Sequence, residues 1–368
     1  MNRASQIGLL AGPIVFLLLT SFSGHLISDM GDKVLAVAAW MIIWWITEAV
    51  SISVTALLPL LVFPLLGVMD LADVGANYGS PIIFLFFGGF VLALALEKVN
   101  LHKRIALSII HRTGTSPDRV ILGFMIATAA LSMWISNTAS TVVMLPIAMS
   151  VIGLLIRDQD GFTPKDRNFA LSVMLGIAFS ANAGGIATVI GTPPNSVLIG
   201  LLENEYNTEI SFLKWMTLGL PVSIILISIS YWVLVKWMFP CKGLAFGTSK
   251  DVIQIELEKL GPASGREKMV LVIFGITVFL WIFRTVINGI FPGLDLTDTA
   301  ISMFGALALF CVPYNFKKGS FILKWKDTSR LAWGILILFG GGLALARAMS
   351  ASGLVDLVSA AIAGSEMS

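Results

Sequence analysis

The chain alternates between long apolar stretches and short polar segments, a spacing typical of membrane-spanning helices. A bilayer core of roughly 30 Å requires about 20 apolar residues per helix. The stretches that meet or approach this length predict spans at 7–27, 34–50, 52–68, 81–97, 168–202, 215–239, 269–290, 297–314 and 331–348. A further apolar stretch, 120–156, has a different pattern. The sequence therefore predicts an all-α polytopic membrane protein.

The stretch 120–156 contains 37 residues without a charged side chain, and a polar cluster of Ser136, Asn137 and Thr138 lies near its middle. The two arms are each about 17 residues long, which is short for a tilted span. The polar cluster has no Gly, Pro or charge, unlike an exposed loop. We expect a re-entrant helical hairpin over 117–156. Two full spans joined by an outer turn remain the alternative, because both arrangements return the chain to the same side.

The stretch 168–202 predicts an interrupted helix. Its 35 uncharged residues would form a helix of about 52 Å at 1.5 Å per residue, far longer than the membrane is thick. Helix is least favourable at Gly191-Thr192-Pro193-Pro194-Asn195, preceded by Gly184-Gly185. Irregular backbone at membrane depth is tolerated where it lines a cavity or is buried in protein. A kinked span with an additional helix outside the membrane remains the alternative.

The Lys and Arg residues predict the orientation of the spans. With a cytoplasmic N-terminus, 20 of the 24 fall at Arg3 or in the connections 98–119, 157–167, 236–268 and 317–330. The opposite connections are acidic, for example at Asp70 and Asp73. We therefore expect a multi-pass protein of the cell membrane with its N-terminus in the cytoplasm.

The composition changes this picture little. The chain is 57% hydrophobic and 12% charged, which a soluble domain of this length would not tolerate. No basic cluster carries interleaved aromatic residues, so we expect no nucleic-acid partner. With three His and two Cys, and no catalytic Asp pair at membrane depth, we expect no enzyme.

Leu101, Ile105 and Ile109 recur every four residues among polar positions that include His102 and Arg104. This pattern predicts an amphipathic helix along the cytoplasmic surface.

A short repeat divides the chain into halves. Residues 83–89, IFLFFGG, are similar to 335–341, ILILFGG, at an offset of 252 residues. Basic residues follow the first copy and acidic residues follow the second, which predicts inverted halves, as in many secondary transporters. Adding the offset to Ser136 places a second polar tip near position 388, beyond Ser368. We therefore expect a second transport unit outside these 368 residues, and no transport by this chain alone.

The predicted domains follow from this repeat. Residues 1–112 would form the first scaffold helices with the amphipathic helix, and 113–240 the first transport unit. That unit would contain the hairpin 117–156, the broken helix 168–202 and the helix 215–239. Residues 241–268 would form a cytoplasmic linker, and 269–368 the second scaffold helices.

The two interruptions suit a charged ligand. Broken helices expose N-termini that favour an anion. Their carbonyls, with the oxygens of Ser132, Ser136, Asn137 and Thr138, suit a hard cation such as Na⁺. Neither uncharged stretch offers Lys or Arg, so a dianion would require cations bound beside it. Alternatively, these polar groups only pack helices together.

The motifs Ser136-Asn137-Thr138-Ala139-Ser140 and Gly191-Thr192-Pro193-Pro194-Asn195 resemble those of the divalent anion/sodium symporter family, which includes Na⁺-coupled dicarboxylate and citrate carriers. Residues 44–48 and 96–104 are also similar to that family. The resemblance implies a homodimer with inverted repeats and an elevator-type movement. It implies a Na⁺ site at Ser132, Ser136, Asn137 and the Gly191 carbonyl, and substrate contacts at Asn137, Thr138, Thr192 and Pro193.

The expected function is secondary active transport of dicarboxylates such as succinate, malate or fumarate, coupled to Na⁺. A Na⁺-independent dicarboxylate exchanger, or a sulfate or citrate symporter of the same fold, remains the alternative.

Overall fold

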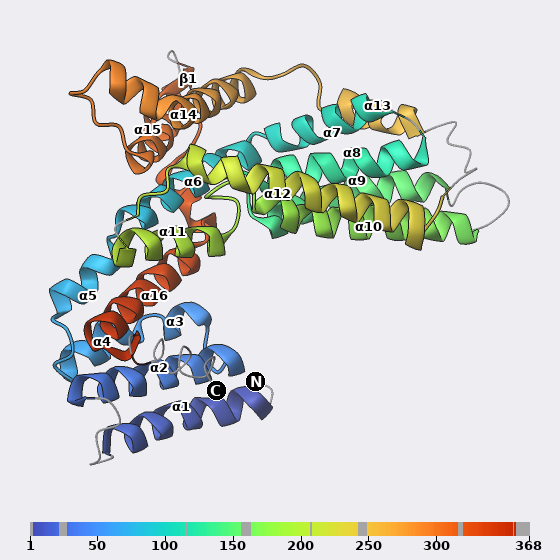
Figure 1. Ribbon diagram of the computed structural model, residues 1–368. Helices are drawn as coiled ribbons and strands as arrows, with labels where there is room; N and C mark the ends of the chain where they lie inside the picture. Colours follow the sequence, from blue (N-terminus) through green and yellow to red (C-terminus); the bar gives the residue numbers. More distant parts are fainter. Residues whose placement is uncertain are drawn as a thin grey trace. The chain divides into compact units, whose positions relative to one another are not determined.

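The computed structural model consists mainly of helices (Figure 1). It describes residues 3–21, 28–114, 116–155, 163–206, 208–241, 249–315, 319–355 and 357. The α-helices are α1 (Arg3–Ser21), α2 (Asp29–Thr47), α3 (Ile52–Thr55), α4 (Leu58–Leu65), α5 (Leu71–Tyr78), α6 (Pro81–Lys98), α7 (Leu101–Thr113), α8 (Pro117–Ser132), α9 (Asn137–Leu155), α10 (Pro164–Gly185), α11 (Pro193–Tyr206), α12 (Phe212–Trp232), α13 (Ser249–Lys259), α14 (Gly265–Ile290), α15 (Asp298–Cys311) and α16 (Trp333–Ala351).

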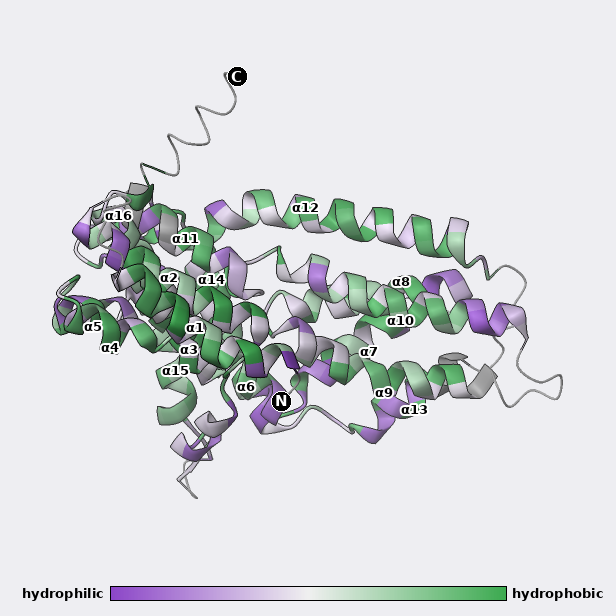
Figure 2. Cartoon of the chain, turned by 90° about the horizontal axis from the view of Figure 1, so that it is seen from below, coloured by the Kyte–Doolittle hydropathy of each residue, from purple (hydrophilic) through white to green (hydrophobic). Residues whose placement is uncertain are grey.

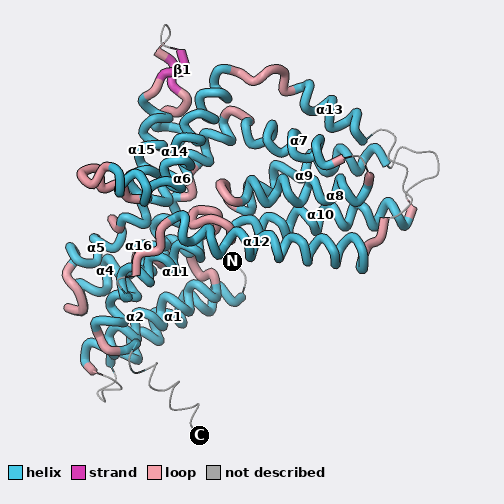
Figure 3. The backbone as a smooth tube through the Cα atoms, turned by 45° about the horizontal axis from the view of Figure 1, so that its top comes forward, coloured by secondary structure: helices cyan, strands magenta, loops and turns pink. Residues whose placement is uncertain are grey.

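Shorter elements complete the described chain. A π-helix, Val233–Met238, continues α12, and a 3-10 helix covers Trp325–Arg330. The strands β1 (Pro313–Asn315) and β2 (Ser320–Phe321) form a short two-stranded sheet (Figure 3). They pair antiparallel, with Pro313 opposite Phe321.

Six described helical segments are long and apolar enough to cross a membrane: 3–21, 29–47, 71–98, 212–238, 265–290 and 333–351. Along α12, hydrophobic positions dominate (Figure 2). Leu218, Ile225 and Trp232 on this helix are each more than half exposed, as expected of side chains that face lipid. The prediction of a polytopic helical membrane protein is confirmed.

Two compact units can be distinguished by their internal contacts. The first contains residues 1–86, 197–209 and 332–368, and the second contains 87–196 and 210–331. The predicted division into scaffold and transport units, and a second polar tip near position 388, stay predictions. Within the predicted linker 241–268, residues 249–259 form α13, which packs against α7 and α9; residues 242–248 lie outside the described chain.

In the first unit, glycines bring helices into close contact. A Cβ added to Gly8 would lie 2.0 Å from Thr47 Oγ1, so α1 and α2 approach at this point. On α16, a Cβ on Gly341 would lie 2.2 Å from the Ala56 carbonyl oxygen. Tyr78 donates a 2.5 Å hydrogen bond to that same oxygen. These contacts fix α1 on α2, and α16 on α3 and α5.

The second unit is built around α8, which packs against α7, α9 and α10. Its core includes Phe124 and Met125 of α8, Ile110 of α7 and Phe169 of α10, all fully buried. Beside it, Phe212 stacks on Trp281 with ring centroids 4.5 Å apart. This packing holds the ends of α8, α9 and α10 in fixed positions.

Two of the predicted spans differ from the structure. The expected span 52–68 is broken into α3 and α4, because Pro59 lacks an N–H and would clash with the carbonyl four residues earlier in a continuous helix. The expected span 297–314 ends as a helix at Cys311, where the chain turns into β1.

The amphipathic helix is present as α7, but its buried face is different. Leu101, His102, Ala106, Leu107 and Ile110 are buried, whereas Ile105 and Ile109 are only partly buried. The helix packs against α8 and α13, so two neighbours rather than one apolar stripe decide which positions are covered.

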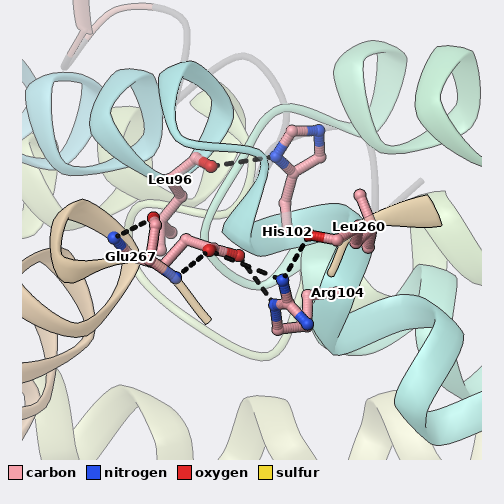
Figure 4. Close-up of polar contacts among 6 residues, drawn as sticks. Leu96, His102, Arg104, Leu260 and Glu267 are labelled. Atoms are coloured by element: carbon pink, nitrogen blue, oxygen red, sulfur yellow. Dashed lines mark hydrogen bonds and ion pairs between the residues drawn. The ribbon is translucent and has the colours of Figure 1, made fainter. Parts of the chain in front are cut away.

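Two polar contacts fix α7 to its surroundings (Figure 4). His102 Nδ1 lies 2.9 Å from the Leu96 carbonyl oxygen of α6, and a carbonyl only accepts, so Nδ1 carries the hydrogen. Arg104 donates to Glu267 of α14 and to the Leu260 carbonyl. Burial lowers the pKa of His102 below its usual value, and the nearby Lys103 charge lowers it further, although the hydrogen bond to Leu96 acts in the opposite direction.

Candidate functional site

The polar tip lies between α8 and α9. The α8 helix ends at Ser132, residues 133–136 are not helical, and α9 begins at Asn137. The predicted helix–turn–helix is therefore present, with its break beside the polar cluster. Whether the hairpin is re-entrant stays a prediction. Ser136 accepts a 3.2 Å hydrogen bond from the Ala139 N–H, so its hydroxyl caps the first turn of α9.

Three oxygens meet beside this tip. Ser132 Oγ lies 2.7 Å from Asn137 Oδ1 and 2.7 Å from the carbonyl oxygen of Ala181 on α10. A hydroxyl carries one hydrogen, so Ser132 donates to one of these acceptors and meets the other oxygen to oxygen. Such a surplus of hard oxygen acceptors suits a small cation.

A second hydrogen bond fixes the nitrogen of the Asn137 amide. Its Nδ2 donates to Asn182 Oδ1 at 3.1 Å. Asn182 belongs to the last turn of α10 and is exposed. The nitrogen therefore faces Asn182 while the oxygen faces Ser132.

The second interruption lies between α10 and α11. Residues 186–192 are not helical, and Asn195 donates to the carbonyl oxygens of Gly185 at 2.9 Å and Thr188 at 2.8 Å. The Thr188 hydroxyl in turn donates to the Met133 carbonyl of the tip. These bonds satisfy backbone groups that the helix break leaves open.

The sequence predicted this break, but not its end. Pro193, Pro194 and Asn195 form the first turn of α11 instead of belonging to the interruption. Proline is tolerated there because the first helical residues have no intrahelical partner for their N–H groups. The interruption therefore ends at Thr192.

Glycines allow the two interruptions to touch. A Cβ on Gly185 would lie 2.5 Å from Asn137 Oδ1. A Cβ on Gly191 would lie 2.5 Å from the Gly185 carbonyl oxygen and 3.0 Å from that of Ser132. The structure thus brings Ser132, Asn137 and Gly191 together. A Na⁺ site at these residues stays a prediction.

The remaining predicted residues lie at the rim of this contact. Thr138 and Ser136 are exposed at the start of α9, and Thr192 and Pro193 are partly buried at the start of α11. The C-terminal ends of α8 and α10 and the N-terminal ends of α9 and α11 therefore frame one region. Carbonyls at the former favour a cation and N–H groups at the latter favour an anion.

Other members of the site had not been predicted. The Ala181 oxygen belongs to the backbone, and every residue has such a carbonyl, so the residue type gives no indication of its role. Asn182 could have been noticed as an amide in an uncharged apolar stretch. Asn195 belongs to the motif Gly191–Asn195, but no role had been assigned to it. Ser140 and Ser180, one turn behind the tip on α9 and α10, are fully buried. Among the described residues neither hydroxyl has a hydrogen-bond partner.

Interrupted helices that meet end to end in a polytopic membrane protein are the architecture of secondary transporters. Comparison with known proteins gives the same class. Residues 4–367 match the family model described as "Sodium:sulfate symporter transmembrane region". The chain belongs to this family, as its motifs predicted. It is a transport protein and not an enzyme.

Individual relatives agree with this assignment. The chain is 41% identical over 362 residues to the sodium-dependent dicarboxylate transporter SdcS of Staphylococcus saprophyticus subsp. saprophyticus, a match covering 96% of this chain and 69% of the relative. It is 41% identical over 360 residues to the transporter of the same name from Staphylococcus aureus strain USA300, with the same coverage.

Proposed function

We propose that the protein transports dicarboxylates of the succinate, malate or fumarate type across the cell membrane together with Na⁺. The observation that carries this proposal is the group of oxygens formed by Ser132, Asn137 and Ala181. They lie within the stretches 120–156 and 168–202, which contain no Lys or Arg. The names of the relatives, sodium-dependent dicarboxylate transporters, agree in both ion and substrate.

The Na⁺ ion would be held by Ser132 Oγ, Asn137 Oδ1, Ser136 Oγ and the Gly191 carbonyl. These are hard, uncharged oxygens, and the donor set fits an alkali cation. The Ser136 hydroxyl accepts one N–H and still has a free lone pair for a metal. A bound ion would relieve the oxygen–oxygen contact at Ser132.

The substrate would lie over the N-termini of α9 and α11. Asn137, Thr138, Thr192 and Pro193 would line it, with amide, hydroxyl and backbone N–H donors for carboxylate oxygens. A helix N-terminus carries roughly half a positive charge, too little to balance a dianion. Bound Na⁺ would supply the remaining charge, which couples the ion to the substrate.

The proposal extends to the architecture. We infer inverted halves from the opposite charges that follow the two copies of the repeat. Both copies also place a glycine at a close contact. A Cβ on Gly88 would lie 2.1 Å from Ser302 Oγ, and one on Gly340 would lie 2.2 Å from Tyr78 Cδ1. A re-entrant hairpin, a cytoplasmic N-terminus, a homodimer and an elevator-type movement complete the proposal, supported by the family and by the charge pattern of the connections.

The test is uptake of labelled succinate by the intact protein in proteoliposomes. We expect an inward Na⁺ gradient to drive accumulation that an equal K⁺ gradient does not drive, with ²²Na⁺ entering alongside succinate. Uptake that is independent of Na⁺ and requires internal dicarboxylate would instead identify an exchanger.

The family description favours sulfate as a second candidate substrate. Competition separates the two: excess malate, but not excess sulfate, should abolish succinate uptake. Inhibition by sulfate alone would reverse the assignment.

A further inference from the structure

We infer that Asn182 is a positioning residue for the Na⁺ site, which keeps the Asn137 amide oxygen turned toward Ser132. This inference rests on the proposed function and adds a residue to it. The side chain of Asn182 contacts Asn137 and acts on the ion through that residue.

The two ends of the Asn137 amide face different partners. Its oxygen lies 2.7 Å from Ser132 Oγ, and its nitrogen lies 3.1 Å from Asn182 Oδ1. An amide can turn by 180° about its last torsion with almost no change in shape. Hydrogen bonds on the two sides therefore decide which atom faces the site.

Without a partner for the nitrogen, the reversed orientation would be favoured in the absence of Na⁺. The Asn137 NH₂ group would then donate to Ser132 Oγ, and the Ser132 hydroxyl would donate to the Ala181 carbonyl, 2.7 Å away. Every group would be satisfied, but an N–H donor would stand where a cation requires an oxygen. Binding of Na⁺ would have to reverse the amide first.

Asn182 opposes this reversal because its oxygen accepts from the Asn137 nitrogen. Asn137 could reverse only if the Asn182 amide turned with it, to present its NH₂ group to the reversed oxygen. Asn182 occupies the last turn of α10 beside Ala181, so the same helix end supplies both the carbonyl that contacts Ser132 and the group that orients Asn137. Asn182 is exposed, so its truncation leaves no cavity in the core.

The decisive variants are Asn182→Ala and Asn182→Asp in the intact protein. Asn182→Ala removes the acceptor and should raise the Na⁺ concentration for half-maximal succinate uptake by about 2- to 10-fold, the value of one hydrogen bond. Asn182→Asp offers only oxygens to the Asn137 nitrogen. It should keep or lower the Na⁺ requirement, while its added charge raises the KM for the dianion.

The matched control is Asn168→Ala. Asn168 lies in the first turns of the same helix and donates a single hydrogen bond, 3.3 Å long, to the Pro240 carbonyl. We expect its Na⁺ dependence to equal that of the wild type. The melting temperature of Asn182→Ala without Na⁺ should also be unchanged, since a general structural role would lower it.

The outcomes separate the inference from the function on which it rests. A wild type without Na⁺-dependent uptake overturns both. If uptake by the wild type depends on Na⁺ and Asn182→Ala has the same half-maximal Na⁺ concentration, only the positioning role is overturned. Equal impairment in Asn182→Ala and Asn182→Asp also overturns it, because the acceptor oxygen would not be what matters.

Discussion

Arg104 and Glu267 are 163 residues apart in the sequence, and Nε of Arg104 lies 2.7 Å from Oε1 of Glu267. Both side chains are largely buried, at 20% and 7% exposure. Glu267 also accepts the Ser264 N–H at 2.7 Å and thereby caps the start of α14. The ion pair therefore joins α7 to the first turn of α14, a candidate membrane span (Figure 4).

Removal of this pair should destabilise the protein. Arg104→Ala leaves the Glu267 carboxylate buried with an unmade charged hydrogen bond, and we expect a loss of about 2 kcal/mol of unfolding free energy. Arg104→Lys should recover part of it, because the single nitrogen of lysine cannot occupy the positions of both Nε, which bonds Glu267, and Nη2, which bonds the Leu260 carbonyl. Thermal unfolding in detergent measures both.

The control for this prediction is Lys33→Ala, which breaks the exposed Lys33–Asp29 pair and should change stability by less than about 0.5 kcal/mol. Equal melting temperatures for Arg104→Ala and Lys33→Ala would contradict a structural role of the Arg104–Glu267 pair.

His102 should make stability depend on pH near neutrality. Burial lowers the pKa of His102 in the folded protein below 6.5, so the unfolded chain binds a proton that the folded chain does not. Stability is then retained above 6.5 and is lost as the pH falls below it. We expect the melting temperature to drop between about pH 7.5 and about pH 5.5, and to drop less in His102→Gln.

Ser108→Ala, on the same helix α7, changes no titratable group; it is the control and should keep the slope of the wild type. An identical pH dependence in His102→Gln and wild type would show that another group titrates.

Gly185 should not tolerate a methyl group. A Cβ at this position would lie 2.5 Å from Asn137 Oδ1, so Gly185→Ala would push the amide oxygen away from Ser132. We expect Na⁺-dependent uptake to fall at least about 10-fold, equivalent to about 1.4 kcal/mol. In Gly153→Ala of α9, where nothing lies within 4 Å, uptake should be retained. Full activity of Gly185→Ala would mean that transport does not need the close contact between the tip and the second interruption.

The hairpin can be tested by labelling Thr138→Cys after Cys241 and Cys311, the two cysteines of the chain, have been replaced by Ser. Thr138 is exposed beside the proposed substrate position. An impermeant thiol reagent should react slowly, and more slowly still with Na⁺ and succinate present. Rapid labelling from outside under all conditions would place Thr138 in an ordinary outer loop.

The sequence predicts the two helix interruptions well, because residue type and element length decide where a helix can continue. A stretch of 35 apolar residues cannot remain one helix within a bilayer, and Gly191 lies in the interruption that results. The break beside Ser136 follows from the same argument. Family motifs then identify Asn137, whose amide the structure places against Ser132.

The remainder depends on tertiary contacts. His102 is buried because α7 packs between two neighbouring helices. The periodicity of apolar residues along α7 alone does not predict this packing. The apolar pattern of 52–68 predicts one continuous helix. The break at Ala56–Leu57 follows only when the effect of Pro59 on the preceding helical turn is considered. The Ala181 carbonyl and the orientation of Asn182 arise only when α10 lies against the tip.

The most direct test of the central claim is the Na⁺ dependence of succinate uptake in Asn137→Ala. This change removes the amide oxygen that lies 2.7 Å from Ser132 Oγ and adds no bulk. Loss of one ligand to a charged ion should raise the half-maximal Na⁺ concentration by about 10- to 100-fold, while Asn168→Ala stays at the wild-type value. An unchanged half-maximal Na⁺ concentration in Asn137→Ala would contradict the account, because the ion would then bind elsewhere.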